Sequence, residues 1–276
     1  MYGIVTRNAE EIEWSEFDVG FYEVKRVTGQ HGEPVEGAVN LVSCFADTAS
    51  AATEDDAVAV DSSGRPATTD HPDLDSGHVC PSDEGYRNGL YEVIEACTRA
   101  SGDVRLDEVG FPGPGFCHCE RCEGAFAESE YDEWAAWRAS VLTSFVAGAA
   151  ERVPGDLYLT LHPDPYPGHL FARSGIDLEA LAAHVDEFVV PLYDTAYGTT
   201  YWLESLASGF ADRLTDLDAR LGVELYAVDP DVDALAAAAE TVEAQADGVY
   251  FGYHSGNARA VLRRWDAEAR DGVEWG

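Results

Sequence analysis

The chain has 276 residues, and 46% of them are hydrophobic, which is enough to build a packed core and excludes a disordered acidic tail. Its 17 basic and 52 acidic residues give a net charge of −35, and Lys25 is the only lysine. Because this charge repels phosphate backbones and anionic lipid surfaces, we expect neither a nucleic-acid nor a membrane partner.

The acidic residues are spread along the whole chain rather than gathered in one segment. Such a composition is typical of a protein kept soluble in concentrated salt, where a Debye length of about 3 Å at 1 M lets like charges lie close together. We therefore hypothesise a halophilic protein, with an ordinary acidic protein as the alternative.

No targeting segment is visible in the sequence. Arg7, Glu10 and Glu11 come before an apolar run could form a signal peptide, and no stretch approaches the roughly 18 apolar residues that span a bilayer. The expected compartment is the cytoplasm, so the six cysteines are interpreted as thiols or metal ligands before disulfides. The expected partner is a small-molecule or oligosaccharide substrate, and homo-oligomers are left open.

The first half of the chain is less regular than the second. Its strand-like runs are Phe17–Val24, Ala38–Phe45 and a short run that ends at Cys80. The segment 47–76 is rich in Thr, Ser, Asp and Gly, which predicts a long loop with a hairpin at Ser62–Gly64. A helix at Asp83–Ala100 follows.

The second half alternates between short apolar runs and longer helical patterns. The runs predict strands at Asp103–Phe111, Leu157–His162, Glu187–Tyr193, Val223–Val228 and Gly248–Tyr253. The helical patterns lie at Tyr131–Val153, Asp177–His184, Tyr201–Leu221, Val232–Gln245 and Asn257–Arg270. Asp177 and Asp231 stand where helix N-caps are expected.

Three strands in the first half and five in the second, with helical crossovers, predict a (β/α)₈ TIM barrel. No internal repeat or linker interrupts it, so we expect a single domain over residues 1–276. A doubly wound open sheet is the alternative. The sequence has no G-x-G-x-x-G after the first strand and no phosphate-binding loop to support that alternative.

Polar and aromatic side chains follow the predicted strands, where such barrels carry their chemistry. They are Asp107, Glu108, His162, Tyr193, Asp194, Asp229 and His254. An Asp beside Pro or Gly, taken singly, is typical of a turn or a cap. Together they indicate a cleft in which paired carboxylates could cleave a glycosidic bond. Aromatic rings that could pack on a sugar, or simply in the core, are Phe111, Tyr166, Tyr193, Tyr197 and Trp202.

Three cysteines lie within six residues, in a loop at 113–126 after the fourth predicted strand. Cys117, Cys119 and Cys122 have the spacing of a loop that wraps a tetrahedral ion, and Cys80 is the natural fourth ligand. Four sulfurs would close the coordination sphere, so the expected cofactor is structural zinc. His118 or Cys97 in place of Cys80, or unliganded thiols, are the alternatives. Cys44 and Cys97 are otherwise interpreted as small buried hydrophobes.

The segment from Cys80 to Phe126 resembles a known family. Cys80-Pro81 with Tyr86-Arg87, then a helix, a strand that ends in Glu108, and the Cys-x-Cys-x-x-Cys loop resemble the barrel domain of family 42 glycoside hydrolases, which are β-galactosidases. Other glycosidase-like (β/α)₈ proteins have similar cysteine loops. The resemblance implies a zinc ion beside the active site and Glu108 as the general acid/base.

The sequence departs from the family pattern in three places. Asp107 precedes Glu108, where the family has Asn. The family nucleophile is a Glu at the end of strand seven, whereas here Glu224 lies near the start of that run and Asp229 at its end. Asp229 is therefore the predicted nucleophile. Family members also carry further domains after the barrel, and we expect this chain to end with it.

The period of a strand bears on the choice between Asp107 and Glu108. Successive side chains point to opposite faces, so both cannot face the lumen of a regular strand. Arg105 and Asp107 share a face and could form an internal ion pair. Asp107 would be the better catalytic candidate if that face is the lumen, and Glu108 is preferred on the resemblance.

The predicted function is glycoside hydrolysis, with Glu108 as acid/base, Asp229 as nucleophile, and Asp107 and Asp194 positioning sugar hydroxyls. Tyr193, His162, His254 and Trp202 complete the predicted substrate-binding set. The alternative is a non-hydrolytic carbohydrate-binding barrel, favoured by the missing strand-seven Glu. A metal-dependent hydrolase using His162, Asp164, Asp194 and His254 is a further rival, although no H-x-H pair follows the first strand to support it.

Overall fold

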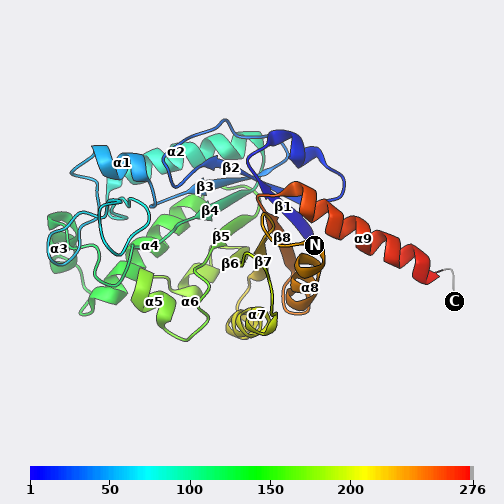
Figure 1. The fold of residues 1–276 in the computed structure, drawn as a ribbon. Helices are drawn as coiled ribbons and strands as arrows, with labels where there is room; N and C mark the ends of the chain where they lie inside the picture. Colours follow the sequence, from blue (N-terminus) through cyan, green and yellow to red (C-terminus); the bar gives the residue numbers. More distant parts are fainter. Residues whose placement is uncertain (274–276) are drawn as a thin grey trace.

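A computed structural model describes residues 1–273 and shows a closed barrel of eight parallel strands in chain order (Figure 1). The strands are β1 (Tyr2–Thr6), β2 (Val19–Lys25), β3 (Val39–Ser43), β4 (Val104–Asp107), β5 (Leu157–Thr160), β6 (Glu187–Leu192), β7 (Arg220–Tyr226) and β8 (Gly248–Gly252). Closure comes from β1, which pairs with β2 on one side and with β8 on the other. The predicted (β/α)₈ fold is confirmed.

Helices surround the strands and connect them. They are the 3₁₀ helix η1 (Ala9–Glu13), α1 (Thr48–Thr53), α2 (Glu84–Ala100), α3 (Glu120–Ala127), α4 (Trp134–Ala150), α5 (His169–Ser174), α6 (Leu178–Ala182), α7 (Tyr201–Leu214), α8 (Val232–Glu243) and α9 (Ser255–Val273). In Figure 1, α9 begins against the barrel and its C-terminal part extends beyond it. Within residues 1–273, no helix combines the length and apolarity needed to cross a membrane.

The first strand was not predicted, and the run that ends at Cys80 is not a strand. Around Cys80 the chain forms only isolated antiparallel bridges, Ala46 with His78 and Val58 with Val79. The sequence analysis therefore predicted the correct number of strands but assigned one of them to the wrong segment. β1 has only five residues and contains Gly3, so its local signal is weak, and its pairing with two neighbouring strands stabilises it.

The predicted loop at 47–76 contains the short helix α1. The Asp47 side chain accepts a hydrogen bond from the Ser50 amide at 2.9 Å and caps this helix. The predicted turn at Ser62–Gly64 is present, because Val60 bridges Pro66 and the Asp61 amide donates to the Arg65 carbonyl at 2.9 Å. The predicted N-caps Asp177 and Asp231 are also confirmed.

Large side chains fill the part of the barrel lumen that lies toward the amino ends of the strands. Phe21 contacts the rings of Tyr158 and Tyr250 edge-on, with centroids 5.3 and 4.7 Å apart. A Cβ at Gly222 would lie 2.4 Å from an oxygen of Glu187 and 2.5 Å from the Tyr250 ring, so only glycine leaves room for this layer. The lumen is therefore a packed core, and access remains at the carboxyl ends of the strands.

Candidate functional site

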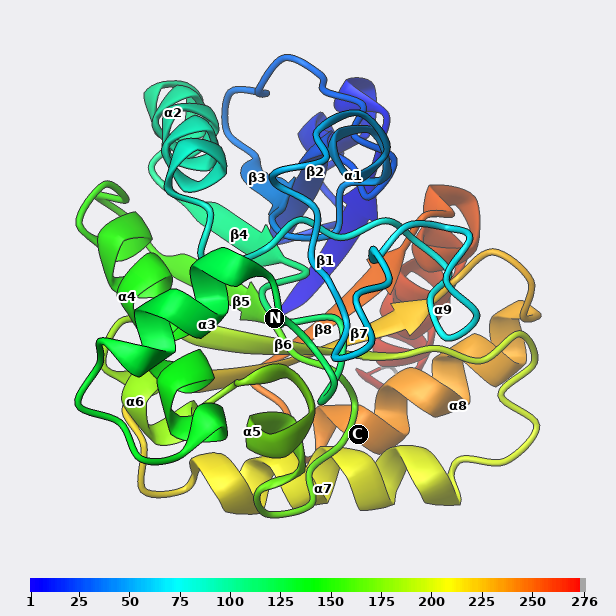
Figure 2. The same cartoon turned by 90° about the vertical axis from the view of Figure 1, so that its left-hand side faces the viewer.

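A cleft of about 640 Å³ lies at the carboxyl ends of the strands. Its walls come from residues at or just after β1, β2, β4, β5, β6 and β8, from the end of α5, and from the segment 73–78 before α2. Figure 2 views the barrel from the side where α1, α3 and α5 lie, among the long loops that follow β3, β4 and β5. The cleft occupies the position at which (β/α)₈ enzymes carry their active sites.

Both carboxylates predicted after the fourth strand line this cleft. β4 ends at Asp107, and Glu108 adopts a left-handed backbone with φ of 52°. The Asp107 carboxylate accepts a hydrogen bond from the Glu108 amide at 3.0 Å. The predicted strand to Phe111 is therefore too long. Because regular alternation stops at Asp107, the two neighbouring side chains can both reach the cleft.

The pKa of Glu108 is raised from 4.5 to about 7. Desolvation by the surrounding walls is the main cause, and the nearby Asp107 carboxylate adds to it. The side chain nevertheless stays open to the cleft. A carboxyl group with this pKa can hold a proton near neutral pH and donate it to a bound molecule.

An ion pair that the sequence analysis missed lies beneath the two carboxylates. Nη2 of Arg105 lies 2.6 Å from an oxygen of Glu224, and both side chains are almost fully buried, at 2% and 1% exposure. The Tyr193 hydroxyl donates to the same Glu224 carboxylate. Arg105 therefore pairs with Glu224, and the predicted ion pair between Arg105 and Asp107 does not form. Arg105 and Tyr193 line the cleft, so this pair forms part of its floor.

A second cluster of charged side chains surrounds Glu23 on β2. The Glu23 carboxylate pairs with Arg7 and lies 3.6 Å from Nε of Arg26. The guanidinium of Arg7 also lies over the Tyr253 ring, 4.8 Å from its centroid. Like Glu108, Tyr253 has a left-handed backbone, with φ of 69°, at the end of a strand. These contacts gather charged and aromatic side chains at the wall of the cleft.

The structure brings only part of the predicted substrate set together. Of the predicted residues besides Asp107 and Glu108, His162 and Tyr193 line the cleft. The remaining four, Asp229, Asp194, His254 and Trp202, are not among its lining residues in the described part of the chain. Asp194 closes a turn by accepting from the Ala196 amide, and Nδ1 of His254 accepts from the Asn257 amide at the start of α9. Asp229 is exposed after β7.

The sequence does carry a signal that these charged residues have partners. Glu23, Arg105 and Glu224 are charged residues inside apolar strand runs, and each is buried. A charge within a buried strand needs a partner. Arg105 and Glu224 come from strands far apart in the chain, β4 and β7, so the sequence does not show that they pair. Glu23 pairs with Arg7 at the end of the neighbouring strand β1.

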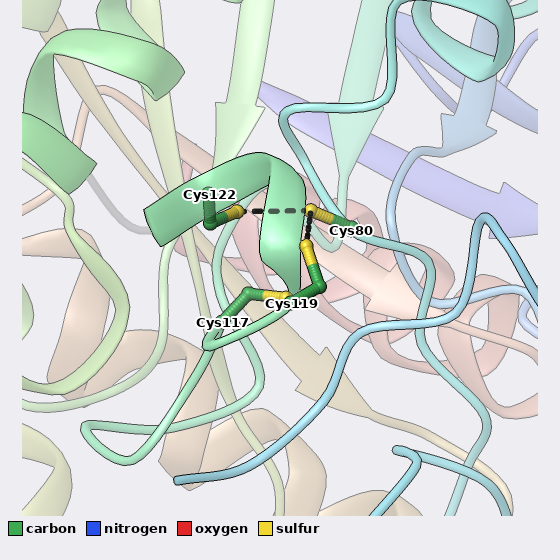
Figure 3. A group of neighbouring side chains, drawn as sticks. All are labelled: Cys80, Cys117, Cys119 and Cys122. Atoms are coloured by element: carbon green, nitrogen blue, oxygen red, sulfur yellow. Dashed lines mark hydrogen bonds between the residues drawn. The ribbon is translucent and has the colours of Figure 1, made fainter. Parts of the chain in front are cut away.

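The four predicted metal ligands converge on one point (Figure 3). All four sulfur atoms of Cys80, Cys117, Cys119 and Cys122 lie within 4.8 Å of one another. Sγ of Cys80 is 3.8 Å from that of Cys119 and 3.3 Å from that of Cys122. Tetrahedral zinc with bonds near 2.3 Å would separate its sulfurs by about 3.8 Å. The donor set and spacing therefore fit such an ion.

The alternative ligands are turned elsewhere. His118 stacks on Trp134, with ring centroids 4.9 Å apart and planes 9° from parallel. Cys97 is buried in α2 and Cys44 follows β3, and neither belongs to the cluster. Cys80 lies before α2 and the other three lie around the start of α3, so the cluster joins the loops that follow β3 and β4.

No protein-family model matches the sequence, and no curated protein matches it. The glycoside hydrolase domain of PgaB (BpsB) from Bordetella bronchiseptica has a TM-score of 0.70 at 10% identity, over 97% of both chains. Alpha-L-fucosidase isoenzyme 2 from Paenibacillus thiaminolyticus gives 0.67 at 13% identity, over 99% of this chain and 50% of that one.

A class V chitinase from Pseudomonas fluorescens Pf-5 gives a TM-score of 0.51 at 14% identity, over 95% of this chain and 98% of that one. Identities this low show a shared fold and no more. The resemblance to family 42 stays a prediction. The chain has the (β/α)₈ barrel fold that these glycoside hydrolases share.

Proposed function

We propose that this protein hydrolyses a glycosidic bond and that Glu108 is the proton donor. The observation that carries the proposal is Glu108 itself, a cleft carboxyl group with a pKa raised to about 7 beside a second carboxyl group. Glycoside hydrolysis needs one carboxyl group that stays protonated and one that stays ionised. The fold shared with glycoside hydrolases supports the proposal by analogy.

Asp107 is the proposed ionised partner. Asp107 lies beside Glu108 and lines the same cleft, and a carboxylate there would stabilise the positive charge that develops on the sugar ring. His162 and Tyr193 would bind sugar hydroxyls. Asp229, Asp194, His254 and Trp202 receive no role in this proposal because they are not among the residues that line the cleft.

The test is hydrolysis of a panel of aryl glycosides and oligosaccharides by the wild type and by Glu108→Gln and Asp107→Asn. Loss of the acid should lower kcat by about 10²–10⁴. Glu92→Gln is the matched control because Glu92 is exposed on α2 and does not line the cleft. A glycan cleaved equally well by Glu108→Gln would contradict the assignment.

A non-hydrolytic carbohydrate-binding protein is the second candidate. It is favoured by the position of Asp229, because the predicted nucleophile is missing from the cleft lining. Binding measured by calorimetry on the same panel separates the two candidates. Saturable binding without turnover by the wild type would support the binding protein, and turnover that depends on Glu108 would support the hydrolase.

We also propose that Cys80, Cys117, Cys119 and Cys122 hold structural zinc. The support is the spacing of the four sulfurs. Zinc bound there would offset half of the charge of the four thiolates and link the two loops, with no open position for substrate. The Val60 amide donates to Sγ of Cys117 at 3.3 Å, the kind of outer hydrogen bond that orients a thiolate ligand.

A further inference from the structure

The cleft gathers positive charge in a chain that has little of it. Of 17 basic residues, four arginines line the cleft, namely Arg7, Arg26, Arg105 and Arg173. Five carboxylates line it as well, so its charges nearly balance, whereas the whole chain carries −35. A site with this local balance can accept an anion that the rest of the surface would repel.

Three of the four arginines have carboxylate partners. Arg7 and Arg26 share Glu23, and Arg105 pairs with Glu224. Among residues 1–269, whose side chains the structure describes, none makes a hydrogen bond or an ion pair with the guanidinium of Arg173. Its side chain is exposed at the cleft wall. All hydrogen-bond donors of the Arg173 guanidinium are therefore available to a molecule bound in the cleft.

The backbone of Arg173 is anchored beside the loop that follows Glu108. The Phe111 amide donates to the Ser174 carbonyl at 3.0 Å. Nη2 of the buried Arg138 donates to both the Gly113 and the Arg173 carbonyls, at 3.0 and 2.9 Å. These bonds hold the end of α5 against the segment 110–113. A group bound at Arg173 would therefore share the cleft with a sugar held at Glu108.

His162 belongs to the same part of the wall. It follows β5 and lines the cleft, and its pKa is lowered by burial and by the charge of Arg173. A neutral imidazole can donate one hydrogen bond beside the guanidinium. A planar guanidinium with an adjacent donor matches carboxylate and sulfate oxygens, which it can bind in bidentate fashion.

A simpler role for Arg173 is to stabilise α5, since a cation in the last turn interacts favourably with the helix dipole. That role does not explain its position in the cleft lining. It does predict a specific result, a loss of stability without a change in ligand preference.

We propose that Arg173 and His162 form a subsite for an anionic substituent, a carboxylate or a sulfate ester, on the sugar whose glycosidic bond is protonated by Glu108. The inference rests on the proposed function and names its substrate class as acidic glycans. Arg173 is a specificity-determining residue in this assignment and takes no part in bond cleavage.

The test measures binding in a Glu108→Gln background, so that turnover does not interfere. Calorimetry at fixed ionic strength compares three acidic glycans with their neutral counterparts: oligogalacturonide and oligoglucuronide for carboxylate, and sulfated galacto-oligosaccharide for sulfate. At least one acidic member should bind at least tenfold more tightly. Arg173→Gln should abolish that preference, and Arg173→Lys should keep part of it.

The matched control is Arg99→Gln, which removes the same charge from an exposed position near the end of α2, outside the cleft. It should leave the preference unchanged. The inference is overturned if no acidic glycan is preferred, or if the preference survives Arg173→Gln. A fall in Tm with unchanged preference would assign Arg173 to helix stability alone.

Wild-type hydrolysis of the same glycans separates this inference from the proposed function. Arg173-dependent binding of acidic glycans that the wild type does not cleave would support the subsite and count against hydrolysis. Cleavage of neutral glycans alone, with loss of activity in Glu108→Gln, would support hydrolysis and overturn the subsite.

Discussion

Glu108 and Tyr253 adopt backbone conformations that side chains other than glycine rarely take, with φ of 52° and 69°. Left-handed geometry costs about 1–2 kcal/mol for such residues. Both stand at the ends of strands and line the cleft. Strain of this kind collects at functional sites, where the rest of the fold maintains it. At Glu108 the left-handed backbone lets two consecutive carboxylates, Asp107 and Glu108, line the same cleft.

The raised pKa of Glu108 predicts a pH-dependent contribution to stability. In the unfolded chain a Glu has a pKa of about 4.3, so folding favours the protonated form up to its folded value of about 7. Stability from this residue is present at low pH and lost as the pH rises through 7. Glu108→Gln should therefore raise Tm relative to wild type more at pH 8 than at pH 4.

Thermal denaturation at both pH values measures this difference, with Glu92→Gln as the control that should show none. Equal shifts at pH 4 and pH 8 would mean that the pKa of Glu108 is ordinary. The same pKa makes hydrolysis decline above pH 7, because a general acid must begin the reaction protonated.

The only lysine of the chain is buried. Nζ of Lys25 lies 2.9 Å from Asp47, and both side chains are 3% exposed. The Asp47 carboxylate also accepts from the Tyr86 hydroxyl at 2.9 Å. Lys25→Met leaves a buried carboxylate without its cation, which should lower the free energy of unfolding by about 3–5 kcal/mol.

Urea denaturation measures the loss. Lys25→Met/Asp47→Asn removes both charges and keeps an N-cap side chain for α1, so it should recover more than half of it. Arg99→Met, at an exposed position, should change stability by less than about 0.5 kcal/mol. A Lys25→Met effect as small as that of Arg99→Met would show that the ion pair contributes no net stability.

At the scale of elements, the two long loops after β3 and β4 behave as one layer. The His118 amide donates to the Val60 carbonyl at 2.8 Å, and the Ser62 amide donates to the Gly115 carbonyl at 3.1 Å. The cysteine cluster joins the same two segments (Figure 3). Residues from both loops, including His78 and Phe111, line the cleft. Anything that loosens the cluster should therefore loosen the cleft wall.

Removing one ligand tests the structural zinc. Cys119→Ser should reduce bound zinc well below one ion per chain, lower Tm, and increase hydrogen exchange in segments 57–80 and 113–126. Cys44→Ala is the control, since Cys44 is a buried cysteine outside the cluster, and should keep its zinc. A Cys119→Ser protein with full zinc content and an unchanged Tm would exclude the four-sulfur site.

At the scale of the whole molecule, the net charge of −35 dominates. Ion pairs occupy most of the few cations, so most carboxylates remain without a cation and repel one another across the surface. Salt shortens the range of this repulsion, because the Debye length falls from about 10 Å at 0.1 M to about 3 Å at 1 M.

Tm should therefore rise steadily from 0.1 to 2 M KCl at pH 7, because the added salt screens the repulsion between the carboxylates. The control is the same titration near the isoelectric point of about 4.2, where the net charge and hence the salt effect should be small. A Tm that is independent of KCl at pH 7 would refute the prediction and remove the physical basis of the halophile hypothesis.

Local patterns were sufficient for most of the barrel. Apolar runs bounded by polar clusters located seven of the eight strands. Asp177 and Asp231 marked helix starts because capping depends on only a few neighbouring residues. The three-cysteine spacing indicated the cysteine cluster for the same reason. β1 was missed because five residues with a glycine give little local signal.

By itself the sequence determined the fold class, the cysteine cluster and the presence of carboxylates at the end of β4, since each depends on short-range periodicity or spacing. Only the tertiary structure decided which charges meet. It paired Arg105 with Glu224 across the lumen, left Asp229 outside the cleft lining, and set Arg173 beside the loop after Glu108. Those contacts join residues far apart in the chain, and barrel closure creates them by bringing the ends of all the strands to one face.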